Sequence, residues 1–343
     1  MAKDRRPRHL NSEAGRVGGT KVKIHISDVD CMSGALSAQI PTQAPFHLEA
    51  TVRVLQRRPS NMVDVWQDGH YARVLEVDDG AILVELENRG TIDVPDVHYC
   101  IRSGEPSAGV TANLRRILGL DVDPSFLHFP VPIDGPLRMT VVALRGMRPP
   151  RFPNLFESFV NVVPFQQLSL EAGVTIVGRL TQRFGRPVEY AGSQYHASPR
   201  ACVIAAARLD QLRACGLSRG KAQTLRNLAR MIEARELSEE ELSRMTSRQA
   251  LQALMELPGI GPWSAALVLL RGLGRLDVFP PGDVGAARGV GQLLQLDRRM
   301  SIDRAVERFG DRRGYLYFCG LGSRLLAKGL IHAAGPEQGT RSY

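Results

Sequence analysis

The sequence predicts an α+β fold, in which a small antiparallel β-rich N-terminal domain precedes an all-helical core. Two strand-like runs, 70–77 and 81–87, flank Asp78-Asp79-Gly80, and such runs around Asp-Gly indicate a β-hairpin. After the proline-rich stretch 121–153, the apolar residues recur mostly at helical spacing. Within this second part, Leu257-Pro258-Gly259-Ile260-Gly261 has the composition of a helix-hairpin-helix turn.

The chain divides into three predicted segments. Residues 1–44 are predicted as a disordered basic arm, and its first part, 1–20, lacks the apolar core of a secretory signal. Residues 45–128 form the β-rich domain with a helix. Residues 129–335 form the helical core, and the helix-hairpin-helix lies at about 249–270.

The elements of the first domain follow from local pattern. From Pro45 to about Ile101 the sequence is strand-like, and further strands are expected at 91–94 and 97–101. Residues 111–120 are predicted as a helix, because their leucine and isoleucine side chains share one face and Gly119 lies near the end.

The second part contains several predicted helices. Ser238-x-x-Glu241 and Thr246-x-x-Gln249 are capping boxes, and each marks the start of a helix. No internal repeat of fixed period occurs. The other helices are expected at 156–184 with a break at Pro164, 201–213, 221–235, 249–256, 262–270 and 315–330.

Composition narrows the function classes. The 343 residues carry a net charge of +9, which fits a polyanionic partner. The five cysteines are scattered and form no Cys-x-x-Cys pair, so neither a disulfide framework nor a zinc site is expected. No apolar run approaches the length of a membrane span. We therefore expect a cytoplasmic protein, associated with the nucleoid if bacterial, that has no membrane partner.

The turn at 257–261 suggests what the polyanion is. Its glycines let the backbone turn sharply and approach another backbone closely. The amides of Gly259, Ile260 and Gly261 then lie at the start of the helix near Pro262, where a phosphate is favoured. Such a contact holds DNA by its backbone and reads no bases.

Asp283 is the candidate catalytic residue. It follows Pro280-Pro281-Gly282 and precedes a helix-like run, so its local context predicts an N-cap. Its position shortly after the hairpin and behind an apolar block also favours a catalytic carboxylate.

Several motifs together resemble one known family. The hairpin with Asp283 downstream resembles the helix-hairpin-helix and Gly/Pro-rich-loop-Asp signature of the base-excision DNA glycosylase superfamily. Within it, the chain is most similar to the DNA-3-methyladenine glycosylase II family, the AlkA type. The resemblance covers about 145–330 well and is weaker over 45–125. The supporting segments are Arg145–Pro150, Phe156–Val160, Gln166–Ser169, Leu212–Ala222 with Cys215 in place of a leucine, and Arg313-Gly314-Tyr315.

The resemblance implies a mechanism. Such enzymes flip the target nucleotide into a pocket and break the N-glycosidic bond through an oxocarbenium-like state, which Asp283 would stabilise. The expected substrates are alkylated purines of the 3-methyladenine type, in double-stranded DNA. Oxidised or deaminated purines are the alternative, and a non-catalytic helix-hairpin-helix DNA-binding protein is a further one. A monomer is expected.

The resemblance also implies roles for residues around the hairpin. Members that act as lyases carry a lysine just after the hairpin. The corresponding position, next to Trp263, is Ser264, which implies a monofunctional enzyme. Gln167 matches the residue that fills the gap left by the flipped base, and Leu168 is expected in the core. Trp263 is expected to line the base pocket, with Leu267 and Arg312 at positions where the AlkA type has tyrosine and tryptophan.

The remaining implications concern cofactors. The backbone carbonyls of Met255, Leu257 and Ile260 occupy positions that bind a structural monovalent cation in the family. No cofactor is expected to be required for the reaction. The cysteines lack the C-terminal spacing of the iron–sulfur members, so no iron–sulfur cluster is expected.

Overall fold

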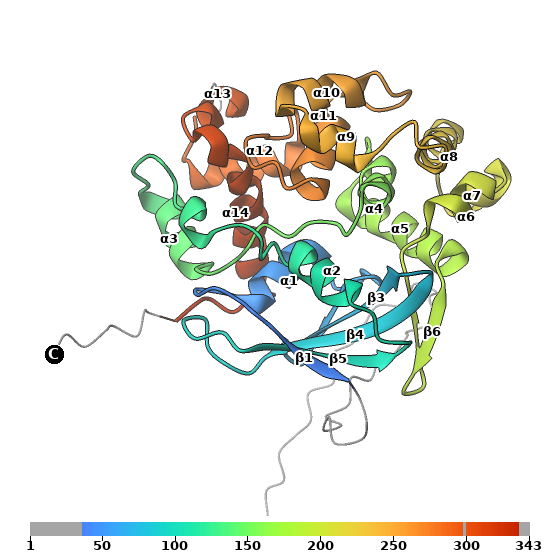
Figure 1. The fold of residues 1–343 in the computed structure, drawn as a ribbon. Helices are drawn as coiled ribbons and strands as arrows, with labels where there is room; N and C mark the ends of the chain where they lie inside the picture. Colours follow the sequence, from blue (N-terminus) through green and yellow to red (C-terminus); the bar gives the residue numbers. More distant parts are fainter. Residues whose placement is uncertain (1–35, 298–299, 336–343) are drawn as a thin grey trace, which may run out of the picture.

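A computed structural model of the chain describes residues 36–297 and 300–335. Five antiparallel strands form a sheet in the order β1-β5-β4-β3-β2, and the helical part lies over one face of this sheet (Figure 1). The predicted α+β class is confirmed. No described helix has the length and apolar character needed to cross a membrane.

The predicted β-hairpin is present at the centre of the sheet. Strand β3 (His70–Val77) pairs with β4 (Gly80–Asn88), and Val77 lies opposite Gly80. Asp78 and Asp79 connect the strands with φ angles of 47° and 62°. Aspartate tolerates these left-handed conformations, which two-residue hairpin turns require. The remaining strands are β1 (Ser37–Ile40), β2 (Val65–Gln67) and β5 (Val97–Ser103).

Three expectations for this part are wrong. Residues 48–56, expected to be strand-like, form helix α1 (Leu48–Gln56), because Leu48, Val52 and Leu55 recur at helical spacing and are buried. Residues 91–94 lie in bends and form no strand. The predicted arm includes strand β1, which pairs with β5, whereas its residues 1–35 lie outside the described chain.

Both faces of the sheet are covered. Helix α1 and helix α2 (Gly109–Ile117) lie on the face turned toward the helical part (Figure 1). A second hairpin, β6 (Pro187–Tyr190) and β7 (Ser193–His196), packs Val188 and Tyr195 against the opposite face. This hairpin was not predicted, since its strands are only four residues each.

The predicted helices of the second part occur in the predicted order, with one division. Two further helices, at 135–143 and 302–307, were not predicted. The expected helix 201–213 is two helices, because Ala207 and Arg208 are extended and Arg208 begins a new capping box. The helices are α3 (Gly135–Ala143), α4 (Leu155–Val160), α5 (Leu170–Phe184), α6 (Ala201–Ala206), α7 (Leu209–Ala214), α8 (Arg219–Glu233), α9 (Glu239–Arg244), α10 (Ser247–Met255), α11 (Pro262–Leu267), α12 (Val284–Leu293), α13 (Ile302–Glu307) and α14 (Arg313–Leu326), with short 3₁₀ segments η1 (Pro124–Leu127), η2 (Val163–Phe165) and η4 (Gly310–Arg312) and the π-helical η3 (Val268–Gly272).

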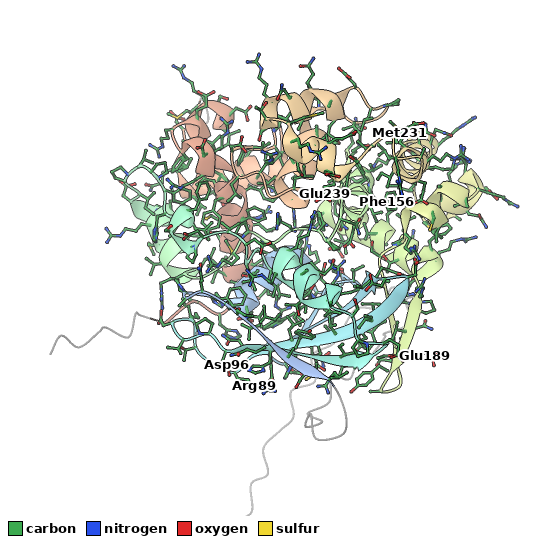
Figure 2. The ribbon with its side chains drawn as sticks, in the orientation of Figure 1. Arg89, Asp96, Phe156, Glu189, Met231 and Glu239 are labelled. Atoms are coloured by element: carbon green, nitrogen blue, oxygen red, sulfur yellow. The ribbon has the colours of Figure 1, made fainter. Side chains whose placement is uncertain are left out.

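Buried charges join the two parts. Arg73 on β3 donates to Asp64 at 2.6 Å and also bonds Glu157 on α4, and all three side chains are buried. Removing one member of such a buried group is costly, because it leaves an uncompensated charge. Glu239 on α9, labelled in Figure 2, pairs with Arg116 on α2.

Helix α1 is also held directly by the helical part. Ala50 and Val54 pack in the same apolar cluster as α14. Arg271 of η3 is buried and donates to the carbonyls of Val54 and Leu55 at 3.4 and 3.3 Å. The C-terminal turn of α1 is therefore fixed against the segment that follows the hairpin.

Candidate active site

A cleft of about 1040 Å³ opens beside the helix-hairpin-helix. Its walls come from the loop after η2, the start of α8, the hairpin, the N-terminus of α12 and one face of α14. Of the residues predicted for the site, the cleft brings together Gln167, Gly259, Gly261, Pro262, Trp263, Ser264, Leu267 and Asp283.

The hairpin joins α10 to α11 as the sequence predicts. Gly259 has a φ of 86°, and a Cβ there would lie 2.1 Å from Thr224 Oγ1 on α8. Gly261 precedes Pro262 at the start of α11, and a Cβ at Gly261 would meet no atom within 4 Å. Gly259 thus permits close packing inside the protein, whereas Gly261 leaves open space in front of the helix. Ile260, between them, is 4% exposed and packs in the core.

Asp283 occupies the N-cap of α12 and lines the cleft. Its Oδ1 accepts the amide of Ala286 at 2.7 Å, as the local sequence predicts. Its Oδ2 accepts the indole N–H of Trp263 at 2.9 Å. The cap and the indole together fix the orientation of the carboxylate, which is half-buried at the cleft wall. The capping role and a chemical role are therefore compatible.

The loop after η2 is fastened to the hairpin. Gln166 donates to the carbonyl of Gly259 at 2.8 Å and to Ser264 Oγ at 2.9 Å. The Lys221 ammonium donates to the carbonyls of Pro164 and Gln166 at 3.1 and 2.5 Å, and burial lowers its pKa. These bonds present Gln167, which is exposed and has a φ of 55°, at the mouth of the cleft.

Two expectations about side chains near the cleft are corrected. Leu168, expected in the core, is 44% exposed, because the loop turns it outward beside Gln167. Arg312 does not line the cleft. Its Nε donates to the Phe126 carbonyl at 2.6 Å, and its guanidinium lies over the Phe126 ring at 4.8 Å. Arg312 therefore fastens η1 to the start of α14.

Other residues complete the cleft that the sequence reasoning did not name. Tyr317, Leu321 and Arg324 of α14 line it and recur at i, i+4 and i+7, so helical periodicity could have identified them as one face. Phe165 of η2 adds an aromatic ring. The cleft is consequently more aromatic than the replacements at Leu267 and Arg312 suggested.

Arg57 also lines the cleft and comes from the N-terminal part. Its Nη2 donates to Asn161 Oδ1 at 3.0 Å, and its guanidinium lies 4.3 Å from the centre of the Phe165 ring. Burial, and then repulsion by Arg271, lower the pKa of Arg57 to about 9. The group still carries its charge at neutral pH. No local signal could have found it, because the segment was expected to be a strand.

Comparisons with known proteins agree with this geometry. Residues 160–311 match the HhH-GPD superfamily of base excision DNA repair proteins, and residues 37–154 match the AlkA N-terminal domain. The chain is 30% identical over 257 residues to a probable bifunctional transcriptional activator/DNA repair enzyme AlkA of Mycobacterium tuberculosis, covering 74% of this chain and 50% of that protein. The chain therefore spans about half the length of this relative.

Two further proteins are similar over most of their length. DNA-3-methyladenine glycosylase 2 of Escherichia coli is 28% identical over 253 residues, which cover 70% of this chain and 82% of that protein. The solved structure of a 3-methyladenine DNA-glycosylase from Archaeoglobus fulgidus superposes with a TM-score of 0.66 at 26% identity, covering 85% of this chain and 99% of that one. With both parts of the chain matched and the hairpin and Asp283 in one cleft, the protein belongs to the AlkA type of the HhH-GPD superfamily of base excision DNA repair proteins.

Proposed function

We propose that this protein is a monofunctional DNA glycosylase that releases alkylated purines of the 3-methyladenine type from double-stranded DNA. The observation that carries the proposal is the Asp283 carboxylate, fixed by Trp263 and the α12 N-terminus at the wall of a cleft of about 1040 Å³. Pockets for drug-sized ligands have similar or smaller volumes, so the cleft has room for a flipped nucleotide.

The proposed chemistry needs one well-placed negative charge. As the bond between C1′ of the sugar and N9 of the base breaks, its electron pair moves to the base and positive charge develops on the sugar. Asp283 stabilises this charge and aligns the water that attacks C1′. A purine methylated on a ring nitrogen is already cationic and departs as a neutral base, so it needs no separate acid.

The hairpin would hold the DNA strand beside this carboxylate. Gly259, Gly261 and Pro262 line the cleft and place open backbone at its mouth. Gln167 stands at the same rim, where it can fill the space left by the extruded base. Phosphate contacts of this kind make binding weaken steeply as the salt concentration rises. Titration of a labelled duplex with the protein, at salt concentrations from about 50 to about 200 mM, measures this effect. We propose that the protein binds as a monomer, which sedimentation of the complex tests.

The proposed absence of lyase activity rests on the residues that follow the hairpin. Trp263 and Ser264 stand there, and neither forms a Schiff base. Lys221 lines the cleft, but its ammonium is held by the Pro164 and Gln166 carbonyls. Incubation with damaged DNA and borohydride should therefore trap no covalent adduct.

A monovalent cation at the hairpin is proposed on family grounds. The carbonyl of Met255 lies at the end of α10, and those of Leu257 and Ile260 lie in the connection to α11. Backbone carbonyl oxygens suit a monovalent cation. The Leu257 carbonyl already accepts a hydrogen bond from the Ile260 amide at 3.0 Å, so it would bind the cation and this amide at the same time. A higher melting temperature in potassium chloride than in choline chloride, at equal ionic strength, would support this site.

Asp283→Asn tests the function. Asparagine also caps helices, so the fold should persist, while the charge at the cleft wall is lost. Release of 3-methyladenine from methylated DNA should fall at least about 100-fold, in the range of lost electrostatic stabilisation, with duplex affinity little changed. Asp303→Asn on α13 is the charge-matched control, because Asp303 is exposed and lies outside the cleft lining.

The outcomes separate the alternatives. Unchanged release by the Asp283→Asn variant means that the mechanism is wrong. A wild-type protein that binds duplex DNA but releases none of 3-methyladenine, hypoxanthine and 8-oxoguanine would be a binding module. A glycosylase for oxidised or deaminated purines would release the last two bases in preference to the first.

A further inference from the structure

Arg57 is a buried cation inside the cleft proposed to take the damaged base. It stands at the C-cap of α1 with a φ of 63°, a positive value that favours glycine. A left-handed backbone at a non-glycine residue is strained, and such strain concentrates at functional sites. Only 8% of the residue is exposed. A charged side chain in this conformation, facing a cavity, needs an explanation beyond helix termination.

The contacts of Arg57 leave part of its guanidinium unused. Nη2 donates to Asn161 Oδ1, and the planar group lies over the Phe165 ring. Its Nε is buried and has no hydrogen-bond partner among the described residues. A buried donor without a partner is costly and is usually satisfied by water or a ligand.

The position of Arg57 is fixed rather than adaptable. Arg271 donates to the carbonyls of Val54 and Leu55, in the same turn of α1. The Arg57 amide bonds the Arg53 carbonyl at 2.8 Å. Two points of attachment therefore hold the backbone that carries the guanidinium, and Phe165 and Asn161 hold the side chain.

A guanidinium held in a fixed position favours some damaged bases over others according to their charge. It repels a base that already carries a positive charge, such as 3-methyladenine in DNA, and it attracts a carbonyl oxygen on a neutral base. When the C1′–N9 bond of a neutral base breaks, the base receives the electron pair and becomes anionic. In hypoxanthine this charge spreads onto the exocyclic oxygen, where a guanidinium stabilises it. The released base then takes up a proton from solvent, which balances the proton that the attacking water loses.

We propose that Arg57 is a specificity-determining residue, which extends release to neutral damaged purines by donating to their exocyclic carbonyl oxygen. This inference rests on the proposed glycosylase function, and it assigns to the N-terminal part a direct role in choosing the base.

The test compares two substrates in two variants. Single-turnover release is measured for hypoxanthine, which is neutral and has the oxygen, and for 3-methyladenine, which is cationic and lacks it. Arg57→Met keeps the length of the side chain and removes the charge. It should slow hypoxanthine release about ten-fold or more, the usual effect of losing one charged hydrogen bond, while 3-methyladenine release stays equal or rises. Arg57→Lys should release hypoxanthine at a rate between those of the wild type and Arg57→Met, because lysine keeps the charge but lacks the planar donor group.

Arg58→Met is the matched control. Arg58 is the next residue, pairs with Glu171 at 3.5 Å and lies outside the cleft lining, so this variant should leave both rates unchanged. A parallel fall of both rates in Arg57→Met, with a lower melting temperature, would mean that Arg57 only supports the fold and would overturn the inference. Equal rates in Arg57→Met and the wild type would overturn it as well.

The wild-type protein gives a second, independent measurement. Free hypoxanthine should inhibit 3-methyladenine release about ten-fold more strongly than free purine, which lacks the exocyclic oxygen. Equal inhibition would contradict the role of Arg57. A wild type that releases 3-methyladenine but never hypoxanthine would overturn this inference alone, whereas a wild type that releases neither base would overturn the proposed function itself.

Discussion

The carboxylate of Asp283 has two partners with different consequences. The Ala286 amide belongs to α12 and stabilises the helix, while the Trp263 indole comes from the hairpin and links the carboxylate to it. The Trp263 bond therefore couples the segment proposed to hold DNA to the group proposed to act on the sugar.

Trp263→Phe should separate stacking from positioning. Phenylalanine keeps an aromatic face but has no N–H, so the carboxylate loses one of its two fixed partners. We expect release of 3-methyladenine to slow about ten-fold, equivalent to about 1.4 kcal/mol, with duplex affinity unchanged. Single-turnover rates and fluorescence anisotropy measure the two effects. Trp66→Phe, at the other tryptophan of the chain, should change neither.

Individual site residues were predictable only where the motif is local in sequence. Trp263, Ser264 and Asp283 follow the hairpin closely, and the structure brings them into one cleft. Arg312 lies next to a recognised motif, but its side chain turns to Phe126, and no sequence spacing specifies that direction. Arg57 reaches the cleft through tertiary packing from about 200 residues earlier in the chain, a contact that local pattern does not encode.

At the scale of the element, the hairpin has an inner and an outer glycine. Gly259 packs against Thr224 of α8, which positions the hairpin on the helical part. Gly261 faces open space at the start of α11. The two glycines are two residues apart, and they should respond differently to the same substitution.

Gly259→Ala should act on the fold, and Gly261→Ala on DNA binding. The first forces a methyl group into Thr224 at a positive φ, which should cost about 1–3 kcal/mol of unfolding free energy. The second should change stability by less than about 0.5 kcal/mol while weakening duplex affinity several-fold, because the methyl group occupies the approach of the DNA backbone. Urea unfolding and anisotropy measure both. Wild-type affinity in Gly261→Ala would mean that DNA does not approach this turn.

Elements with strong local signals were predictable, and those decided by packing were not. The β3–β4 hairpin carries its turn residues, and Thr246 with Gln249 forms a complete capping box at the start of α10. Helix α1 contains threonine and valine, which suggest a strand, and its helical state depends on burying one face against the sheet and α14. The β6–β7 hairpin is too short to show an alternating pattern.

At the scale of the whole molecule, His47 joins distant parts of the chain. Its Nε2 lies 2.9 Å from the His332 carbonyl, which makes Nε2 the donor, and its Nδ1 accepts the Ala50 amide at 3.3 Å as the N-cap of α1. The bond from Ala50 requires a neutral ring, because a protonated Nδ1 cannot accept, whereas the bond to the His332 carbonyl can form in either charge state. Burial lowers the pKa of His47 below its ordinary value of 6.5, although the bond to the His332 carbonyl opposes this shift.

Stability should therefore fall in mild acid. Between pH 6.5 and the lower folded-state pKa, the unfolded chain binds a proton at His47 that the folded chain does not. The contribution of the neutral His47 to the free energy of unfolding is fully present above pH 6.5 and is lost as the pH falls below 6.5. His47→Asn, which caps without titrating, should reduce the loss by up to about 1 kcal/mol. Urea unfolding at several pH values measures this. His128→Asn, at an exposed histidine, should keep the wild-type slope, and an equal slope in all three proteins would contradict the role of His47.

The grip of Arg271 on α1 has a mechanical consequence. Arg271 is a buried guanidinium that bonds the C-terminal turn of α1 from the helical part, and this attachment restrains movement between the two parts. We therefore expect the cleft to keep its shape when DNA binds. Under the proposed mechanism, the deformation needed to extrude a nucleotide then falls on the duplex. Weakly paired or poorly stacked lesions would be admitted most readily, because they offer the least resistance to leaving the helix.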